Sequence, residues 1–561
     1  MTASGRDFPA AASERDELVF LPLGGAGEIG MNLTLYGYRG DWLMIDCGVT
    51  FGDGSMPGVE VMMPDPGFIA ARRDRLLGLV VTHGHEDHIG AIPYLWERLR
   101  CPVYATPFTR ALLHEKLVEA RLHQAVPITE VALSGSFTLG PFAIELISLT
   151  HSIPEPNAVV LRTPLGTVLH TGDWKLDPDP LIGPTADEAA LERLGAAGVL
   201  ALVCDSTNAL RPGHSGSEGE VRGALIDLVG RYRQRVAIAC FASNVARLES
   251  IAAAAAAHGR SVALVGRSLW RIYKAARDTG YLRDLPEFLT EDEAGYVPRD
   301  RLLLVCTGSQ GEPRSALARI AQGDHPHIAL EADDAVIFSS RVIPGNERAI
   351  GRLQNLLVKR DIVILTEHDH FVHVSGHPAQ DELTRMYQLV RPQIAVPVHG
   401  EARHLLGNAA LARDCGVPAT VIAQNGEMVR LAPGPPALVD TVPVGRLAVD
   451  GTVLRPLDSA ALKSRQRMLF GGAAVATIVV DGRGRLLAPP QITVRGLLDE
   501  AEEAEQLGAL GEAAAAALRA LPPEARRDDG AVREAARLAI RRALKAATGK
   551  APVTDIHIVR V

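Results

Sequence analysis

The segment His83-Gly84-His85-Glu86-Asp87-His88 places three imidazoles and two carboxylates within six residues. It follows the apolar run 76–81, Leu-Leu-Gly-Leu-Val-Val, and precedes the segment 89–96, Ile-Gly-Ala-Ile-Pro-Tyr-Leu-Trp. The apolar run predicts a buried strand and the later segment predicts a helix, so the histidines lie on the connecting loop. Such loops hold ligands at the carboxyl edge of a sheet. Neutral imidazole and carboxylate bind zinc and similar ions, which we favour over a merely hydrated, histidine-rich loop.

Ligand-type residues follow other predicted strands in the same way. Asp46 ends the apolar run 42–45, His151 follows the run 146–149, and Asp173 comes shortly after the run 167–169. One acid or histidine at a strand end is more often structural, but its recurrence predicts a sheet edge that collects ligands for two ions, with one carboxylate bridging them. Asp46 could cap its strand, or it could hold a ligating histidine in the required tautomer.

Length and composition narrow the class of protein. The 561 residues, 47% hydrophobic and 22% charged, predict a soluble chain with more than one domain. No apolar run reaches the ~18 residues needed to span a membrane. Residues 1–17 lack an apolar segment, which predicts a disordered leader and not a signal peptide, and we expect a cytoplasmic protein. A net charge of −8 argues against a broadly basic nucleic-acid binder, so a polyanionic substrate would need a local channel and the metals.

The cysteines and the glycine-rich segment are less informative. The six cysteines form no CxxC pair, so we expect reduced core residues. Gly25-Ala-Gly27-Glu-Ile-Gly30 has the spacing of the dinucleotide fingerprint, but that fingerprint opens a helix, whereas residues 31–36 alternate like a second strand. We therefore expect a glycine-rich hairpin beside the site and no nucleotide cofactor.

The motif His83-x-His85-x-Asp87-His88, with Asp46, His151 and Asp173, resembles the metallo-β-lactamase superfamily, whose αββα fold carries a binuclear metal centre. Three later segments resemble the motifs of the β-CASP nucleases: Cys204-Asp205-Ser206-Thr207-Asn208, His373-Val374-Ser375-Gly376-His377 and Pro397-Val398-His399-Gly400-Glu401. A histidine at position 399 is typical of the RNA-cleaving members. Segments 23–32, 241–247 and 307–313 are similar to the ribonuclease J family.

The resemblance implies an α/β protein in which a Rossmann-like β-CASP domain is inserted into the metallo-β-lactamase sandwich. Within the insert, the apolar runs 236–240 and 301–306 predict strands, and the alanine-rich segment after Ile251 predicts a helix. The proline-rich segment 432–436 predicts the start of a linker region. The expected boundaries are 1–207 and 361–450 for the lactamase domain, 208–360 for the insert, 451–470 for the linker and 471–561 for a small C-terminal α+β domain.

The resemblance also assigns roles at the site. It implies one metal on His83, His85 and His151, a second on Asp87, His88 and His399, and Asp173 as the bridge. We expect two Zn²⁺ per subunit, with Mn²⁺ as the alternative because carboxylates contribute. Such a pair would activate a shared water and clamp a phosphate oxygen. His377 is the expected general acid, with Asp205 orienting it.

Substrate contacts follow from the remaining motifs. His373, Val374, Ser375, Gly376 and His377 are expected to offer donors to a substrate phosphate. Ser243, Asn244 and Arg247, with Ser309, Gln310 and Gly311, are expected to bind a terminal 5′-monophosphate, for which an arginine fork is suited. Each alone could instead be structural, such as a helix-capping Ser243 or a surface Arg247. A pocket of this kind would set cleavage one nucleotide from the 5′ end.

We therefore expect a metal-dependent ribonuclease, a 5′→3′ exonuclease that prefers 5′-monophosphate ends and acts in RNA decay and maturation. Endonuclease activity would require RNA to bypass the pocket. One alternative is a small-molecule hydrolase like glyoxalase II, which would need neither the insert nor the later histidines. The other is a non-catalytic scaffold, which would lack ligands. The expected partners are RNA, a second or further copies in a homodimer or homotetramer, and RNA-decay proteins, with no membrane.

Overall fold

The computed structural model describes residues 15–52 and 54–561, so most of the predicted N-terminal leader lies outside the described residues. The chain divides into two compact units. Of the described residues, the first contains 15–51 together with Met62–Arg446, and the second contains 52 and 54–61 together with Leu447–Val561. Among the described helices, none combines the length and apolar character needed to cross a bilayer.

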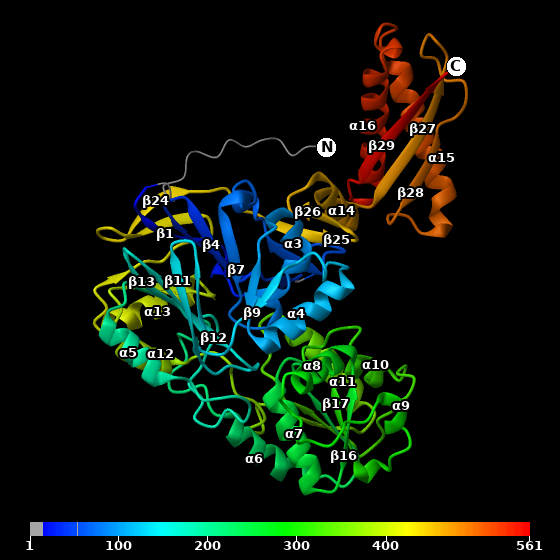
Figure 1. Ribbon diagram of the computed structural model, residues 1–561. Coiled ribbons are helices and arrows are strands. Elements are labelled where there is room, and N and C mark those ends of the chain that lie inside the picture. The colour runs from blue at the N-terminus through cyan, green and yellow to red at the C-terminus, as the bar shows by residue number, and fades with distance from the viewer. Residues whose placement is uncertain (1–14, 53) are drawn as a thin grey trace. The chain divides into compact units, whose positions relative to one another are not determined.

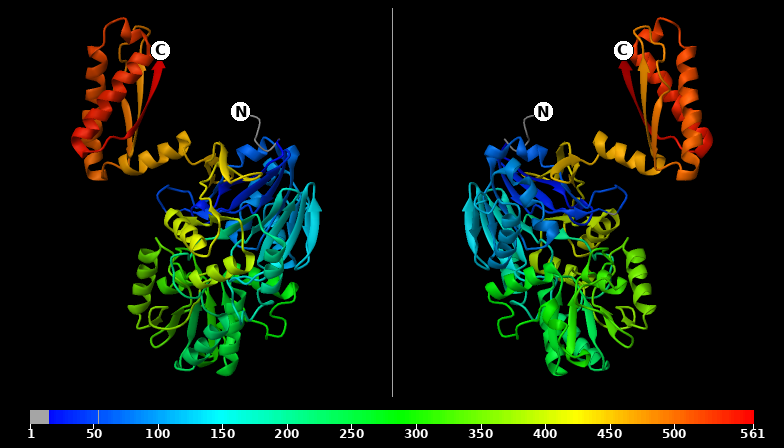
Figure 2. Two further views of the ribbon diagram at one scale, coloured as in Figure 1. Left: turned by 90° about the vertical axis from the view of Figure 1, so that its left-hand side faces the viewer. Right: turned by 90° about the vertical axis from the view of Figure 1, so that its right-hand side faces the viewer.

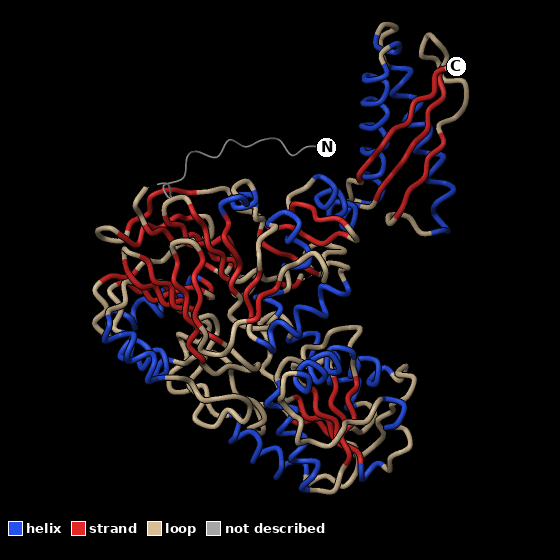
Figure 3. The backbone as a smooth tube through the Cα atoms, viewed as in Figure 1, coloured by secondary structure: helices blue, strands red, loops and turns tan. Residues whose placement is uncertain are grey.

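Two sheets pack face to face in the first unit, as the red strands of Figure 3 show. The first sheet has the order β24 (Ala437–Thr441), β23 (Glu427–Ala432), β1 (Leu18–Gly24), β3 (Leu33–Tyr38), β4 (Asp41–Ile45), β7 (Leu76–Val80), β8 (Val103–Ala105) and β9 (Ile128–Glu130). The second has the order β10 (Ser136–Leu139), β11 (Phe142–Ser148), β12 (Asn157–Thr163), β13 (Gly166–His170), β14 (Ala201–Asp205), β20 (Ile394–Val398) and β22 (Ala419–Thr420).

The hydrophobic core joins the inner faces of these sheets. Phe20 and Tyr36 of the first sheet belong to the same buried cluster as Phe142, Leu161 and Val203 of the second. Helices cover the outer faces (Figure 1), namely α3 (Ile92–Leu99) and α4 (Pro107–Glu119) on one side and α5 (Glu188–Ala197), α12 (Gln380–Val390) and α13 (Ala402–Asp414) on the other. This is the expected αββα sandwich, and the prediction of the fold class is confirmed.

The inserted domain has its own parallel sheet with helices around it, in the order β16 (Ser261–Val265), β17 (Leu302–Cys306), β15 (Val236–Ala239), β18 (Ala335–Phe338) and β19 (Val363–Leu365). Both predicted strands and the alanine-rich helix, α7 (Val245–Ala257), are present. The other main helices are α6 (Glu218–Val229), α8 (Arg267–Asp278), α10 (Ala316–Gln322) and α11 (Glu347–Val358). In both views of Figure 2 the insert, drawn in green, lies below the two sheets of this unit.

The second unit ends in a three-stranded sheet of β27 (Ala473–Val480), β28 (Gln491–Arg495) and β29 (Val553–Arg560). Its core residues, such as Ile478 and Ile556, pack with Leu518 of α15 (Glu500–Ala520) and Ile540 of α16 (Asp529–Thr548). The expected C-terminal α+β domain is therefore present.

The predicted linker is a structured segment. Its proline-rich start is the turn between β23 and β24, and residues 446–471 form β25 (Arg446–Asp450), β26 (Val453–Pro456) and α14 (Ala460–Gly471). Contacts of Arg465 help to explain why this segment is ordered: its guanidinium lies 2.9 Å from Asp450 Oδ1 and donates to the Pro57 carbonyl. Composition alone missed this segment because its partners are distant in sequence.

The motif His83–His88 follows β7, and its last three residues belong to the short helix α2 (Glu86–Ile89). The strand and the helix are present as predicted, but only His83, Gly84 and His85 of the motif lie in the connecting loop. The chain after β4 runs beside this loop: Cys47 N donates to His88 O at 2.7 Å. Gly48 allows this approach, since a Cβ there would lie 1.6 Å from the carbonyl oxygen of Asp87. The glycine-rich hairpin is also present, with β1 and β3 antiparallel and with Gly25 O accepting from His399 N at 2.7 Å. The described cysteines are all free thiols.

The core between the sheets predicts a large cost for Leu161→Ala, because Leu161 is only 1% exposed within that core. We expect the free energy of unfolding to fall by about 2–5 kcal/mol. Leu406→Ala, at a position that is 58% exposed, is the matched control and should change it by less than about 0.5 kcal/mol. Thermal and urea unfolding measure both, and equal shifts in the two variants would contradict this core.

Candidate functional site

The candidate site lies where several strands of the sandwich end. β13, β14 and β20 are neighbouring parallel strands, so their carboxyl ends bring Asp173, Asp205 and His399 to one edge. His151 follows β11. Its neighbour Thr150 pairs with Lys175 in an isolated antiparallel bridge, which brings the His151 segment beside the segment of Asp173. His83 and His85 come from the loop after β7 of the first sheet, and Asp87 and His88 come from the helix α2 that follows it. The fold thus collects side chains that are more than 300 residues apart in the sequence at one place.

Three imidazoles converge on the first half of the site. His85 Nδ1 lies 3.1 Å from His83 Nε2 and 3.1 Å from His151 Nε2. Asp173 Oδ2 is 4.0 Å from the first of these Nε2 atoms and 3.9 Å from the second. These four residues therefore offer one donor atom each to a common point.

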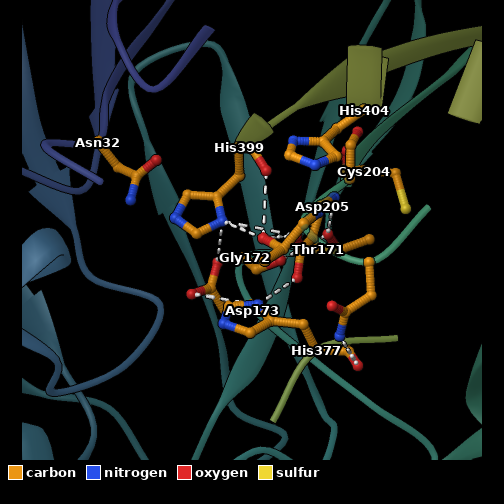
Figure 4. A network of polar contacts seen from close by, with 12 residues as sticks. Asn32, Thr171, Gly172, Asp173, Cys204, Asp205, His377, His399 and His404 are labelled. Carbon is orange, nitrogen blue, oxygen red and sulfur yellow. Dashed lines mark hydrogen bonds and ion pairs between the residues drawn. The ribbon is translucent and has the colours of Figure 1, made fainter. Parts of the chain in front are cut away.

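The second half uses the same carboxylate. His88 Nε2 lies 3.2 Å from Asp173 Oδ2, and His399 Nε2 lies 3.2 Å from Asp87 Oδ2. Asp87, His88, Asp173 and His399 form a second group of converging donor atoms. Figure 4 shows His399 and Asp173 pointing toward each other, with Asp205 and His377 beside them. Asp173 belongs to both groups, as a bridging carboxylate would.

The far nitrogen of four of these rings is held by a polar group. His88 Nδ1 donates to Asp46 Oδ2 at 2.7 Å, and His151 Nδ1 donates to the Gly376 carbonyl. Thr82 Oγ1 donates to Asp46 Oδ2 and accepts from His83 Nδ1 at 3.0 Å. A ring that donates through Nδ1 leaves the lone pair of Nε2 free, which is the tautomer a metal ligand needs.

The Thr207 hydroxyl holds the His399 ring in the same way, through its Nδ1 nitrogen. The hydroxyl donates to Asp205 Oδ1 at 2.7 Å and accepts from His399 Nδ1 at 2.9 Å.

Asp46 and His399 both adopt left-handed backbone conformations, with φ of 61° and 51°. For residues other than glycine this conformation is uncommon and tends to occur at functional sites.

The charges of the site are divided between its two halves. Burial lowers the pKa of His83 and His151 well below the usual value and lowers the pKa of His85 to about 4, so burial favours the neutral form of these rings. Burial has the same tendency at His88 and His399, but the neighbouring carboxylates, Asp173 foremost, raise the pKa of both rings well above it. The second half of the site therefore requires positive charge.

The residues present fit a pair of divalent cations. Asp173 Oδ1 is buried and accepts no hydrogen bond, a state that costs free energy unless another group compensates it. A neutral His85 ring can donate from Nδ1 to only one of the Nε2 atoms of His83 and His151, so at least one lone pair in this group stays without a hydrogen at 3.1 Å. A cation in each group removes both problems, and an all-nitrogen-and-oxygen donor set suits zinc or manganese.

A third group lies against the second. His377 Nδ1 is 2.8 Å from Asp205 Oδ2 and 3.8 Å from Asp173 Oδ2. Burial favours the neutral ring, but the Asp205 carboxylate outweighs it and raises the pKa of His377. With Nδ1 donating to Asp205, the Nε2 nitrogen is left for a reacting group, and the side chain keeps 22% of its surface exposed.

The fold and this geometry agree with comparisons to known proteins. The chain matches the models "Metallo-beta-lactamase superfamily" over residues 27–230, "Ribonuclease J, beta-CASP domain" over 233–357, "Zn-dependent metallo-hydrolase RNA specificity domain" over 361–422 and "Ribonuclease J C-terminal domain" over 460–561. It is 46% identical to a ribonuclease J of Sinorhizobium meliloti over 98% of both chains. The chain belongs to the ribonuclease J family.

Other relatives support the same assignment. A ribonuclease J of Thermus thermophilus is 36% identical, covering 96% of this chain and 94% of its own. One from Mycolicibacterium smegmatis is 43% identical, covering 86% and 87%. A solved structure titled as a protein of unknown function from Enterococcus faecalis has a TM-score of 0.51 at 15% identity, covers 74% of this chain and 100% of its own, and supports the fold alone.

Within this ribonuclease J family chain, the loop 372–377 is held from both sides. Asn208 Nδ2 donates to Ser375 Oγ at 2.8 Å and to the His377 carbonyl at 3.0 Å. Ser375 Oγ also accepts from His377 N at 3.2 Å. Val374 is buried, and a Cβ on Gly376 would lie 2.7 Å from the His151 ring. The loop is therefore fixed directly against the candidate metal ligands.

Arg247 does not form the expected phosphate fork. Its side chain is 0% exposed, and its Nη2 lies 3.1 Å from both carboxylate oxygens of Glu218. Its Nη1 donates to the carbonyls of Ser339 and Val372, each at 2.9 Å. A buried guanidinium whose nitrogens are already bonded in this way cannot also reach a ligand phosphate, so Arg247 supports the start of the 372–377 loop instead.

Of the other residues predicted to line the phosphate pocket, some use their side chains in hydrogen bonds within the protein and others are partly exposed. Asn244 caps α7 by accepting from Arg247 N, and its Nδ2 donates to Glu218. Gln310 uses its amide on the 340–346 loop, donating to Arg341 O at 2.8 Å and accepting from Ile343 N at 2.9 Å. Ser309 is buried, whereas Ser243 and Gly311 remain partly exposed.

Sequence reasoning missed several residues of the site. Thr82 adjoins the histidine motif and Thr207 adjoins Asp205, so the position next to each motif was the available signal. Glu218 and Arg341 gave no local signal, because their partners lie 29 and 133 residues away.

Thr82→Val tests the role assigned to the polar groups around the rings. The substitution preserves shape but removes the hydroxyl that fixes Asp46 and His83, so metal affinity should fall about 10–100-fold. Chelator competition measures it. Thr554→Val, which removes another buried, hydrogen-bonded hydroxyl in the second unit, is the control and should leave the affinity unchanged. Unaltered affinity in Thr82→Val would contradict the proposed orientation of His83.

Proposed function

We propose that this chain is a metal-dependent ribonuclease that hydrolyses phosphodiester bonds of RNA. The observation that carries the proposal is the Asp173 carboxylate, which belongs to all three groups of converging donors. The relatives are named ribonuclease J, and the RNA specificity model matches the segment that carries His373 and His377, which supports RNA as the substrate. A small-molecule hydrolase is not favoured.

The proposed ligands divide as the geometry does. His83, His85 and His151 would hold one ion, Asp87, His88 and His399 the other, and Asp173 both. When bound, the pair supplies Lewis acidity, which lowers the pKa of a water and neutralises charge on a phosphate oxygen. The donor set favours zinc, with manganese as the alternative. Asp46, Thr82 and Thr207 orient the rings.

The chain's own acid is His377. Hydrolysis that leaves a 5′-phosphate must protonate the departing 3′ oxygen, and a protonated imidazole can deliver that proton from Nε2. Asp205 fixes the ring by accepting from Nδ1, and its charge keeps the proton on the ring until transfer. Burial opposes ionisation of Asp205, but the adjacent His377 outweighs it and lowers the pKa of that carboxyl, so it stays an acceptor.

The loop 373–376 lies beside this acid and would position the substrate phosphate through its backbone and the Ser375 hydroxyl. We further propose that RNA is degraded 5′→3′ from 5′-monophosphate ends, with Ser243, Ser309, Gln310 and Gly311 near the terminal phosphate. Endonucleolytic cleavage would require RNA to bypass that pocket.

A role in RNA decay and maturation, a cytoplasmic location and a homodimeric or homotetrameric state belong to the same proposal. They follow from the family resemblance, as does association with other RNA-decay proteins. So do the proposed domain boundaries, near residues 207, 360 and 450.

End-labelled single-stranded RNA carrying a 5′-monophosphate or a 5′-triphosphate tests the activity. The monophosphate substrate should release mononucleotides faster, and His83→Ala or Asp173→Asn should lower turnover about a thousandfold or more, because each removes a ligand. Asp227→Asn, an exposed position on α6, is the control and should retain activity. Wild-type turnover in Asp173→Asn would refute the metal mechanism, and no cleavage by the wild-type protein would refute the proposed function.

His377→Gln and Asp205→Asn test the acid. Each should lower kcat about 10²–10⁴-fold with little change in KM, because the proton transfer occurs in the transition state. Since Asp205 is proposed to act through His377, the double variant should be about as impaired as His377→Gln alone. Steady-state kinetics of all three measure this, and multiplicative losses would show that the two residues act separately.

A further inference from the structure

Arg341 is an exposed cation beside the candidate site. It lies in the loop that follows β18, and none of the ion pairs found in the described chain includes it. Its Nη1 donates to Asn208 Oδ1 at 3.1 Å. A guanidinium has five N–H donors, so most of its hydrogen-bonding capacity is unused.

Asn208 connects this guanidinium to the proposed acid. Both protons of its amide are used, one on Ser375 Oγ and one on the His377 carbonyl. The amide oxygen is therefore the atom left to accept from Arg341. One side chain separates the Arg341 guanidinium from the loop that faces the scissile phosphate.

The backbone of Arg341 is fixed, which sets it apart from an ordinary surface arginine. Gln310 Nε2 donates to the Arg341 carbonyl at 2.8 Å and to Ser340 Oγ at 3.3 Å. Gln310 Oε1 also accepts from Ile343 N and from Asn346 Nδ2. With the backbone and one guanidinium nitrogen both anchored, less side-chain freedom remains to be lost when a ligand binds.

The surroundings of His373 also indicate an anion. Its Nδ1 is buried with no hydrogen-bond partner, and burial together with the charges of Arg247, Lys175 and Arg341 lowers the pKa of the ring well below its usual value. Arg247 is paired with Glu218, and Lys175 lies 2.7 Å from Asp177. Arg341 forms no ion pair within the described residues, so of these three cations it is the one left to bind an anion.

We propose that Arg341 binds a phosphate group of the RNA beside the loop 373–377, through the guanidinium donors that Asn208 does not use. The inference rests on the proposed ribonuclease function and gives Arg341 the role that the buried Arg247 cannot fill. A planar fork of donors matches two oxygens of a phosphate. The phosphate is either the terminal 5′-monophosphate or one of the backbone.

Salt dependence of catalysis tests this directly. For Arg341→Gln on single-stranded RNA we expect KM to rise about tenfold with kcat changed much less, because one charge-assisted contact is lost. The plot of log kcat/KM against log salt concentration should become less steep by about 0.7, the value for one phosphate contact on a single strand. A role confined to folding would not change that slope.

Two further variants serve as controls. Arg341→Lys keeps the charge and loses the fork, so it should restore the slope while KM recovers only in part. Arg231→Gln removes an exposed charge just beyond the end of α6, about 20 Å along the helix direction from Glu218, and should change neither quantity. Thermal unfolding of all variants should match the wild type.

RNA with a 5′-monophosphate and RNA with a 5′-hydroxyl distinguish the two phosphates. A loss confined to the first substrate indicates the terminal phosphate, and an equal loss on both indicates the backbone; either result supports the inference. A slope and KM for Arg341→Gln equal to those of Arg231→Gln would overturn it. That result would leave the proposed function intact, provided that the wild-type protein cleaves RNA.

Discussion

The shared approach of imidazole nitrogens to the Asp173 carboxylate is the interaction on which the rest of the site depends. Lone pairs facing one another and a bare carboxylate oxygen are unfavourable in a protein interior unless a cation lies between them. Hydrogen bonds behind the rings, from Asp46, Thr82, Thr207 and the Gly376 carbonyl, hold this arrangement in place. Because these groups hold the Nδ1 atoms of His83, His88, His151 and His399, those four rings face the centre of the site with Nε2. His85 faces it with Nδ1.

The topology explains how distant residues reach one point. β14 and β20 are parallel neighbours, yet the chain leaves the first after Asp205 and returns to the second only at Ile394, with the insert in between. The insert is therefore built into the edge that carries the ligands, and the loop with His377 is supported from the insert through Arg247. Residues for proton transfer thus come from the sandwich, whereas the surroundings that would accept a polymer come from the insert.

The sequence predicted the parts that depend on local pattern. An apolar run followed by His83 to His88 is sufficient to predict a strand with donor side chains at its end, and His151 and Asp173 follow their strands in the same way, as the convergence of their donor atoms shows. It failed where burial depends on a distant partner. Arg247 was expected to bind a 5′-monophosphate because nothing near it in the sequence indicates its buried partner Glu218. The order of residues 451–470 was not foreseen because it depends on Pro57, which lies 408 residues before Arg465. Whether the side chain of a motif residue such as Arg247 is buried or exposed depends on tertiary packing, which the local sequence does not show.

Anomalous diffraction from crystals grown with zinc or manganese would locate the ions directly. Two peaks are expected within the site, one on each side of the Asp173 carboxylate. His85 should reach its ion through Nδ1, and His83, His88, His151 and His399 should reach theirs through Nε2. A single peak, or two peaks that do not share Asp173, would contradict the account.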